Sequence, residues 1–99
     1  MVIGALTADL LLGDVHSLKQ KRAVIRPLLA QLRRRDEVAA AETGHQQLHR
    51  RAELTVAVIA PDHAHVRDVL EDCERALDGF AEVEILSIRR RVLDDDDLE

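Results

Sequence analysis

The sequence VIGALTADLLL, residues Val2–Leu12, predicts a long β-strand at the centre of the molecule. Its residues alternate between an apolar side and a side that carries Thr7 and Asp9, which is the period of a half-buried strand. Leucine occupies both sides near the end of the run, and this favours a central position over an edge position. The residues expected on the buried side are Val2, Leu6, Ala8, Leu10 and Leu12.

A helix is predicted directly after this strand, from residue 18 to about residue 34. Ser17, followed by Gln20 three positions later, matches the capping-box pattern of a helix start. Apolar residues then recur at helical spacing and form one stripe that we expect to be buried. The stripe consists of Leu18, Ile25, Leu28, Leu29 and Leu32.

Two strands and a second helix are predicted next. DEVAAAET, residues 36–43, is rich in alanine, which has a poor β-propensity, and we predict an edge strand. ELTVAVIA, residues 53–60, alternates clearly between apolar and other residues. A regular apolar stripe then begins after Asp62 and ends near Gly79, and it predicts the second helix.

The last predicted strand covers residues 82–93, and a shift of its apolar phase between Ile85 and Leu86 indicates a β-bulge. The order β-α-β-β-α-β predicts a ferredoxin-like α+β sandwich, with two helices on one face of a four-stranded antiparallel sheet. A chain of 99 residues fits one domain, which we place at residues 1–93. The acidic residues 94–99 are predicted to be disordered.

The composition is that of a globular protein with an aliphatic core, since 46% of the residues are hydrophobic but only one is Phe and none is Tyr or Trp. A single cysteine, Cys73, excludes an internal disulfide framework. The first residues lack the basic-then-apolar pattern of a secretory signal, so a cytoplasmic protein is expected. We expect no membrane span, because no apolar run approaches the roughly 20 residues that cross a bilayer.

Charge is distributed unevenly along the chain. The net charge is -5, and residues 94–99 alone contribute five of the 19 acids. Residues 1–51 hold nine Lys or Arg against five acids, whereas residues 52–99 hold five against 14. Twelve of the 14 Lys and Arg residues are Arg, a bias that suits bidentate contacts to phosphate or carboxylate but can equally reflect a GC-rich genome.

Most of the cations of the first predicted helix fall on one flank. At about 100° per residue, four of them lie within a band of about 60° beside the apolar stripe. Such a row, next to the amide groups of a helix start, suits phosphate binding, and a solvated helix flank is the alternative interpretation. The four residues are Lys19, Arg22, Arg26 and Arg33.

Lys21 differs from these cations because its angular position lies inside the apolar stripe. An unpaired ammonium group would be costly there. Glu42 shares a strand face with apolar residues of the second strand, so we predict a structural ion pair between Lys21 and Glu42. A lysine that extends its ammonium group to water is the alternative.

No catalytic site and no metal site are predicted. His45 and His49 have helical spacing and His63 lies two positions before His65, but neither pair is joined by a nearby Cys. Nucleophile-elbow, phosphate-loop and dinucleotide motifs are absent from the sequence, so we expect a protein that is not an enzyme and uses no cofactor.

The sequence resembles the YlxP-like family of small bacterial proteins, a domain of unknown function. The resemblance lies in three segments: SLKQKRAVIRPLLAQLRRR after a long strand, a strand that ends in AET, and GHQQLHRRAELTVAVIA. The resemblance covers the chain to about Leu93. It implies a ferredoxin-like fold and a place in the bacterial cytoplasm. It also implies a link to RNA or the ribosome, because genes of this family often stand beside genes for a transcription elongation factor, a translation initiation factor and ribosome-binding factor A.

Two function classes remain open after the sequence. The first is a non-enzymatic RNA- or ribosome-associated factor that binds phosphates through the basic helix flank; the scarcity of aromatic residues favours recognition of phosphate and shape over base stacking. The second is a homodimeric protein-interaction module that uses sheet edges or the uncovered sheet face, where Ile3, Ala5 and Ile59 are expected.

Overall fold

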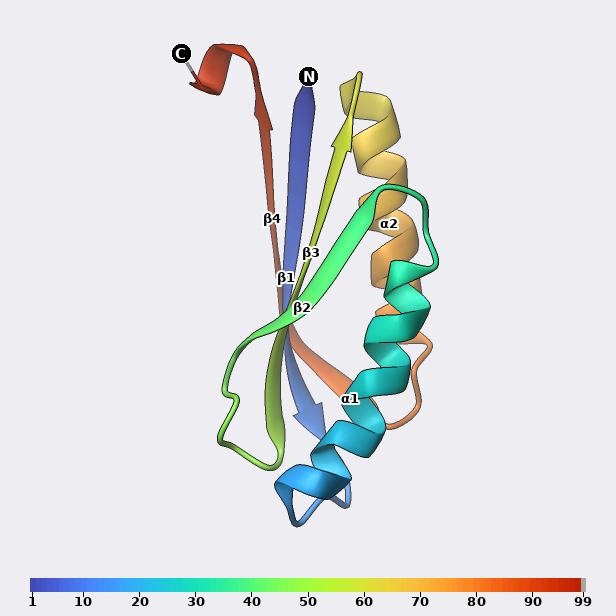
Figure 1. Cartoon of the computed structure of the whole chain (residues 1–99), viewed down its shortest axis with the longest axis vertical. Helices are drawn as coiled ribbons and strands as arrows, with labels where there is room; N and C mark the ends of the chain where they lie inside the picture. The colour runs from blue at the N-terminus through green and yellow to red at the C-terminus, as the bar shows by residue number, and fades with distance from the viewer. Residues whose placement is uncertain (99) are drawn as a thin grey trace.

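The structure is a computed structural model that describes residues 1–98, and it contains two helices packed on one side of a sheet (Figure 1). The first strand runs through the middle of the sheet, as its sequence predicts. A short 3-10 helix follows the last strand. The elements are β1 (Val2–Leu12), α1 (Leu18–Arg33), β2 (Val38–Gly44), β3 (Arg51–Ala60), α2 (His63–Asp78), β4 (Val83–Asp94) and η1 (Asp96–Leu98).

The sheet has four strands in the order β2-β3-β1-β4, and every neighbouring pair is antiparallel. This order places β1 and β3 at the centre and leaves β2 and β4 as the two edges. With both helices on one face, the arrangement is an α+β sandwich of the ferredoxin-like type, and the predicted fold class is confirmed.

Alternate residues of β1 form the centre of the core. Leu6, Ala8, Leu10 and Leu12 are fully buried against the helices, which confirms the predicted buried side. The core is aliphatic throughout. Its other large, fully buried side chains are Leu28, Leu32, Leu54, Val56, Val58, Val66, Leu70, Cys73 and Leu77.

The predicted β-bulge lies at Leu86. Asp9 of β1 pairs with Ser87, but the next residue, Leu10, pairs with Ile85, so Leu86 is one extra residue in β4. The extra residue returns apolar side chains of β4 to the helix side of the sheet on both sides of the bulge, which is why Ile85 and Ile88 both pack against the core.

The acidic end of the chain begins inside β4, which includes Asp94. The sequence predicts disorder for residues 94–99, but Asp94 ends β4 and Asp96–Leu98 form the 3-10 helix η1. Residue 99 lies outside the described residues. The carboxylate of Asp95 lies 2.9 Å from the N-terminal ammonium group of Met1. This contact joins the start of β1 to the acidic segment after β4, at one end of the molecule (Figure 1).

Within residues 1–98, no helix is long and apolar enough to cross a membrane.

Cys73 is buried on the core side of α2, and burial raises the pKa of its thiol. A raised pKa lowers the thiolate fraction, so this cysteine contributes packing rather than reactivity.

Candidate anion-binding site

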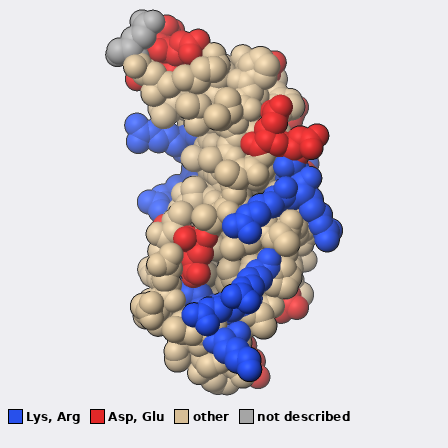
Figure 2. Space-filling model, in the orientation of Figure 1, with Lys and Arg blue, Asp and Glu red and all other residues tan. Residues whose placement is uncertain are grey.

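The two helices carry opposite charge. The 16 residues of α1 include five Lys or Arg and no Asp or Glu, whereas those of α2 include five acids and two Arg. Figure 2 shows Lys and Arg side chains gathered over the part of the molecule that α1 occupies in Figure 1. The structure therefore presents an electropositive helix beside an electronegative one.

Three of the four predicted anion-binding residues line one groove on α1. Lys19, Arg22 and Arg26 surround a surface hollow of about 430 Å³ together with Ala23 and Pro27. Ala23 and Pro27 have short side chains and form the floor of the groove, and the longer side chains of the three cations form its walls. Among the described residues, none of the three cations takes part in an ion pair.

The structure separates Arg33 from this groove. Its Nε and Nη2 atoms donate hydrogen bonds of 3.0 and 2.6 Å to the backbone carbonyl of Ala40. The guanidinium group thus ties the end of α1 to the edge strand β2. We therefore define the α1 groove as Lys19, Arg22 and Arg26, without Arg33.

Side chains at the start of α1 accept hydrogen bonds from two nearby backbone amides. Ser17 Oγ accepts a hydrogen bond of 3.1 Å from the amide of Gln20, and the Gln20 side-chain oxygen accepts one of 2.6 Å from the amide of His16. These contacts follow from the capping residues seen in the sequence. They use the amides of His16 and Gln20, so these two donors are not free to bind an anion.

Lys21 is buried and forms an ion pair with the partly exposed carboxylate of Glu42. Lys21 is only 2% exposed, and its Nζ lies 2.8 Å from Glu42 Oε2. The same ammonium group donates a hydrogen bond of 2.7 Å to the backbone carbonyl of His45. Since Lys21 does not reach water, its charge fastens α1 to the end of β2 and is not part of the groove surface.

A second charged cluster, at the same end of the sheet, was not predicted. Arg51 Nη2 donates a hydrogen bond of 2.5 Å to Asp9 Oδ2, and His45 Nε2 lies 3.5 Å from Asp9 Oδ1. The hydrogen bond from Arg51 holds the pKa of the Asp9 carboxyl below its ordinary value and raises the pKa of Arg51. Asp9 and Arg51 lie on neighbouring strands, so only the strand register brings them together.

This cluster makes stability depend on pH. A carboxyl with a lower pKa in the folded chain stabilises the fold above its unfolded pKa, about 3.9, and this contribution is lost as the pH falls through the folded pKa. Asp9→Asn is therefore expected to cost stability near pH 7, with a difference from the wild type that shrinks below about pH 4. Urea unfolding at several pH values measures this, with Asp36→Asn as the control; a difference that stays constant with pH would contradict it.

Most of the remaining arginines already have partners, so they do not extend the basic surface of α1. Arg50 donates to the carbonyls of Leu12 and Gly13. Two arginines of β4 are paired with acids, Arg89 with Glu53 at 3.6 Å and Arg90 with Glu74 at 2.8 Å.

The two histidines of α2 contact acids on different parts of the chain. His63 contacts Asp94 at 3.2 Å, and His65 lies 3.7 Å from Glu37. In the described part of the chain, no group of three or more His, Cys, Asp or Glu side chains is arranged to hold a metal ion.

Comparison with known proteins gives three findings. Residues 3–90 match the model of a family described as "Protein of unknown function (DUF503)". The chain is 26% identical over 83 residues to the uncharacterized protein YlxP of Bacillus subtilis (strain 168), covering 84% of this chain and 90% of that protein. A de novo designed protein, Foldit4, is similar in fold alone, with a TM-score of 0.57 at 12% identity over 96% of this chain and 99% of the design.

Proposed function

This chain belongs to the DUF503 family of proteins of unknown function, as its resemblance to the YlxP-like family predicted, and we propose that it is a non-enzymatic cytoplasmic factor that associates with RNA or the ribosome. In this proposal, the α1 groove of Lys19, Arg22 and Arg26 binds backbone phosphates. The family assignment by itself carries no activity, so the proposal rests on the groove.

The observation that supports the proposal most is the concentration of unpaired cations. Lys19, Arg22 and Arg26 lie on successive turns of one helix that has no acid, and none is in an ion pair within residues 1–98. Cations that serve only solubility are usually interspersed with acids, as they are on α2. A row of free cations releases the counterions of a nucleic acid on binding, which is the main source of affinity for phosphate backbones.

Recognition in this proposal is by phosphate and shape. The only aromatic residue, Phe80, follows α2, packs against the core and does not line the α1 groove. Base stacking on aromatic side chains therefore has no basis at this site. Little sequence preference and a steep dependence on salt are the expected properties.

We expect the variant Lys19→Gln/Arg22→Gln/Arg26→Gln to lose most of the affinity for RNA and for ribosomal subunits. Contact with three phosphates implies that raising the salt from about 50 to about 200 mM weakens wild-type binding by about 20- to 40-fold. Fluorescence anisotropy with a labelled ribosomal RNA hairpin, and cosedimentation with ribosomal subunits, measure both effects.

The matched control is Arg34→Gln/Arg67→Gln/Arg91→Gln, which removes the same charge from exposed cations outside the groove. It should bind nearly as well as the wild type. Equal losses in both variants would show that net charge alone attracts RNA, and equal, negligible binding by all three proteins would remove the proposal. Circular dichroism establishes that each variant is folded.

The alternative function is a homodimeric interaction module that uses the uncovered face of the sheet. One observation favours it: Ile59 is 61% exposed and lies in register beside Ile3, which in turn pairs with Leu93, so the three form an apolar row. A molecular mass that rises with concentration and does not change with salt would support this alternative.

A further inference from the structure

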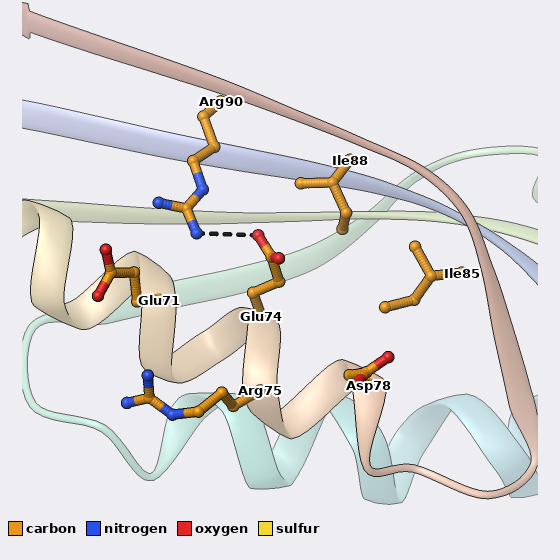
Figure 3. A pocket seen from close by; sticks show the side chains of 7 residues that line it. All are labelled: Glu71, Glu74, Arg75, Asp78, Ile85, Ile88 and Arg90. Atoms are coloured by element: carbon orange, nitrogen blue, oxygen red, sulfur yellow. Dashed lines mark hydrogen bonds and ion pairs between the residues drawn. The ribbon is translucent and has the colours of Figure 1, made fainter.

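A groove of about 390 Å³ lies between α2 and the edge strand β4, on the helix side of the sheet. Figure 3 shows its side chains: Ile85 and Ile88 of β4 extend toward α2, and Arg90 meets Glu74 across the gap. Both isoleucines are partly buried and pack against the core. The complete lining is Glu71, Glu74, Arg75, Asp78, Ile85, Ile88 and Arg90.

The rim of this groove has unbalanced negative charge. Its two cations are already engaged, Arg90 with Glu74 at 2.8 Å and Arg75 with Asp72 at 3.5 Å. Glu71 and Asp78 have no ion pair among the described residues. An apolar floor between two uncompensated carboxylates is complementary to a ligand with both apolar and basic side chains.

The groove borders a strand edge that has no neighbour. β4 has 12 residues and pairs only with β1, so within the described residues no strand lies along its other side. Free backbone groups at a sheet edge accept an added strand, and alternate side chains of that strand then face the same side of the sheet. A strand added to β4 would place every second side chain at the groove.

A second copy of this chain is a poor occupant. Two copies joined through β4 by a two-fold axis would bring α2 of each copy toward α2 of the other. Glu71 and Asp78 would then approach the same carboxylates of the partner, and like charges in apposition are unfavourable.

We propose that an extended segment of a partner protein adds to β4 as a fifth strand, with alternating basic and apolar side chains in the α2/β4 groove. The apolar side chains cover Ile85 and Ile88, and the basic ones pair with Glu71 and Asp78. This inference uses a different surface from the α1 groove and does not depend on RNA binding.

The test uses two labelled synthetic peptides, KTVTKTVTK and ETVTETVTE, which differ only in the charge of the side that would face the groove. We expect the lysine peptide to bind at least about tenfold more tightly. It should also shift the methyl NMR signals of Ile85 and Ile88 in the full chain.

Two charge-matched variants localise the binding. Glu71→Lys/Asp78→Lys should lower the affinity for the lysine peptide by about tenfold or more. Asp36→Lys/Asp68→Lys, at exposed acids outside the groove, should leave that affinity unchanged.

Equal weakening in both variants would overturn the proposal, because it would show attraction by net charge alone. Binding of neither peptide, unmoved Ile85 and Ile88 signals, or a homodimer that already fills the groove would overturn it as well.

Discussion

Glu42→Ala is expected to lower the free energy of unfolding by about 3 kcal/mol, because it leaves the buried ammonium group of Lys21 without its carboxylate. Lys21 is 2% exposed and retains only the hydrogen bond to the carbonyl of His45 in this variant. Breaking one member of a buried pair costs far more than the pair itself contributes. Urea unfolding monitored by circular dichroism measures the change.

Two controls separate this effect from a simple loss of side-chain contacts. The double variant Lys21→Met/Glu42→Leu removes both charges and should recover stability to within about 1 kcal/mol of the wild type. Glu84→Ala, at an exposed acid of β4, should change stability by less than about 0.5 kcal/mol. A double variant as unstable as Glu42→Ala would contradict a buried, pair-dependent charge.

Gly4→Ala is expected to destabilise the fold by about 2 to 3 kcal/mol, since it overpacks a full core. A Cβ at this position would lie 2.3 Å from Val66 Cγ1 and 3.1 Å from Leu70 Cδ1. Gly4 therefore allows α2 to approach β1 closely. Thermal and urea unfolding measure the loss.

A second substitution tests whether Val66 is the clashing neighbour. In Gly4→Ala/Val66→Ala the methyl groups removed from Val66 make room for the new one at residue 4. The double variant should therefore lose at least about 1 kcal/mol less unfolding free energy than the two single variants lose in sum. Gly13→Ala is the matched control, because a Cβ at Gly13 meets nothing within 4 Å. Simple additivity of the Gly4 and Val66 effects would contradict the close contact.

The fold was largely predictable because its signals are local. The alternation in Val2–Leu12 marks the central strand, and the apolar shift after Ile85 marks the bulge, which the structure places at Leu86. Capping residues likewise mark the helix starts. The side chain of Ser17 accepts a hydrogen bond from the Gln20 amide, as the sequence indicates. Each of these features depends on neighbours within a few residues.

The candidate site was predictable only in part. Angular position on one helix places Lys19, Arg22 and Arg26 together, but it cannot show that Arg33 bonds to Ala40 of β2, since that contact depends on how the helix packs. The contact between Asp9 and Arg51 was missed for a related reason.

Asp9 and Arg51 are 42 positions apart in the chain and meet only through the register of β1 and β3. A polar residue on a mostly apolar strand, as Asp9 is, was the one available signal. It indicates that a partner exists without identifying it.

The most direct test of the α1 groove is the slope of log affinity for RNA against log salt concentration, measured for the wild type and for Lys19→Gln/Arg22→Gln/Arg26→Gln. The slope counts the phosphates that cations neutralise, so it reports the contact itself. Phosphate binding by the groove predicts a slope shallower by about 2 to 3 in the variant. Identical slopes for the two folded proteins would contradict it.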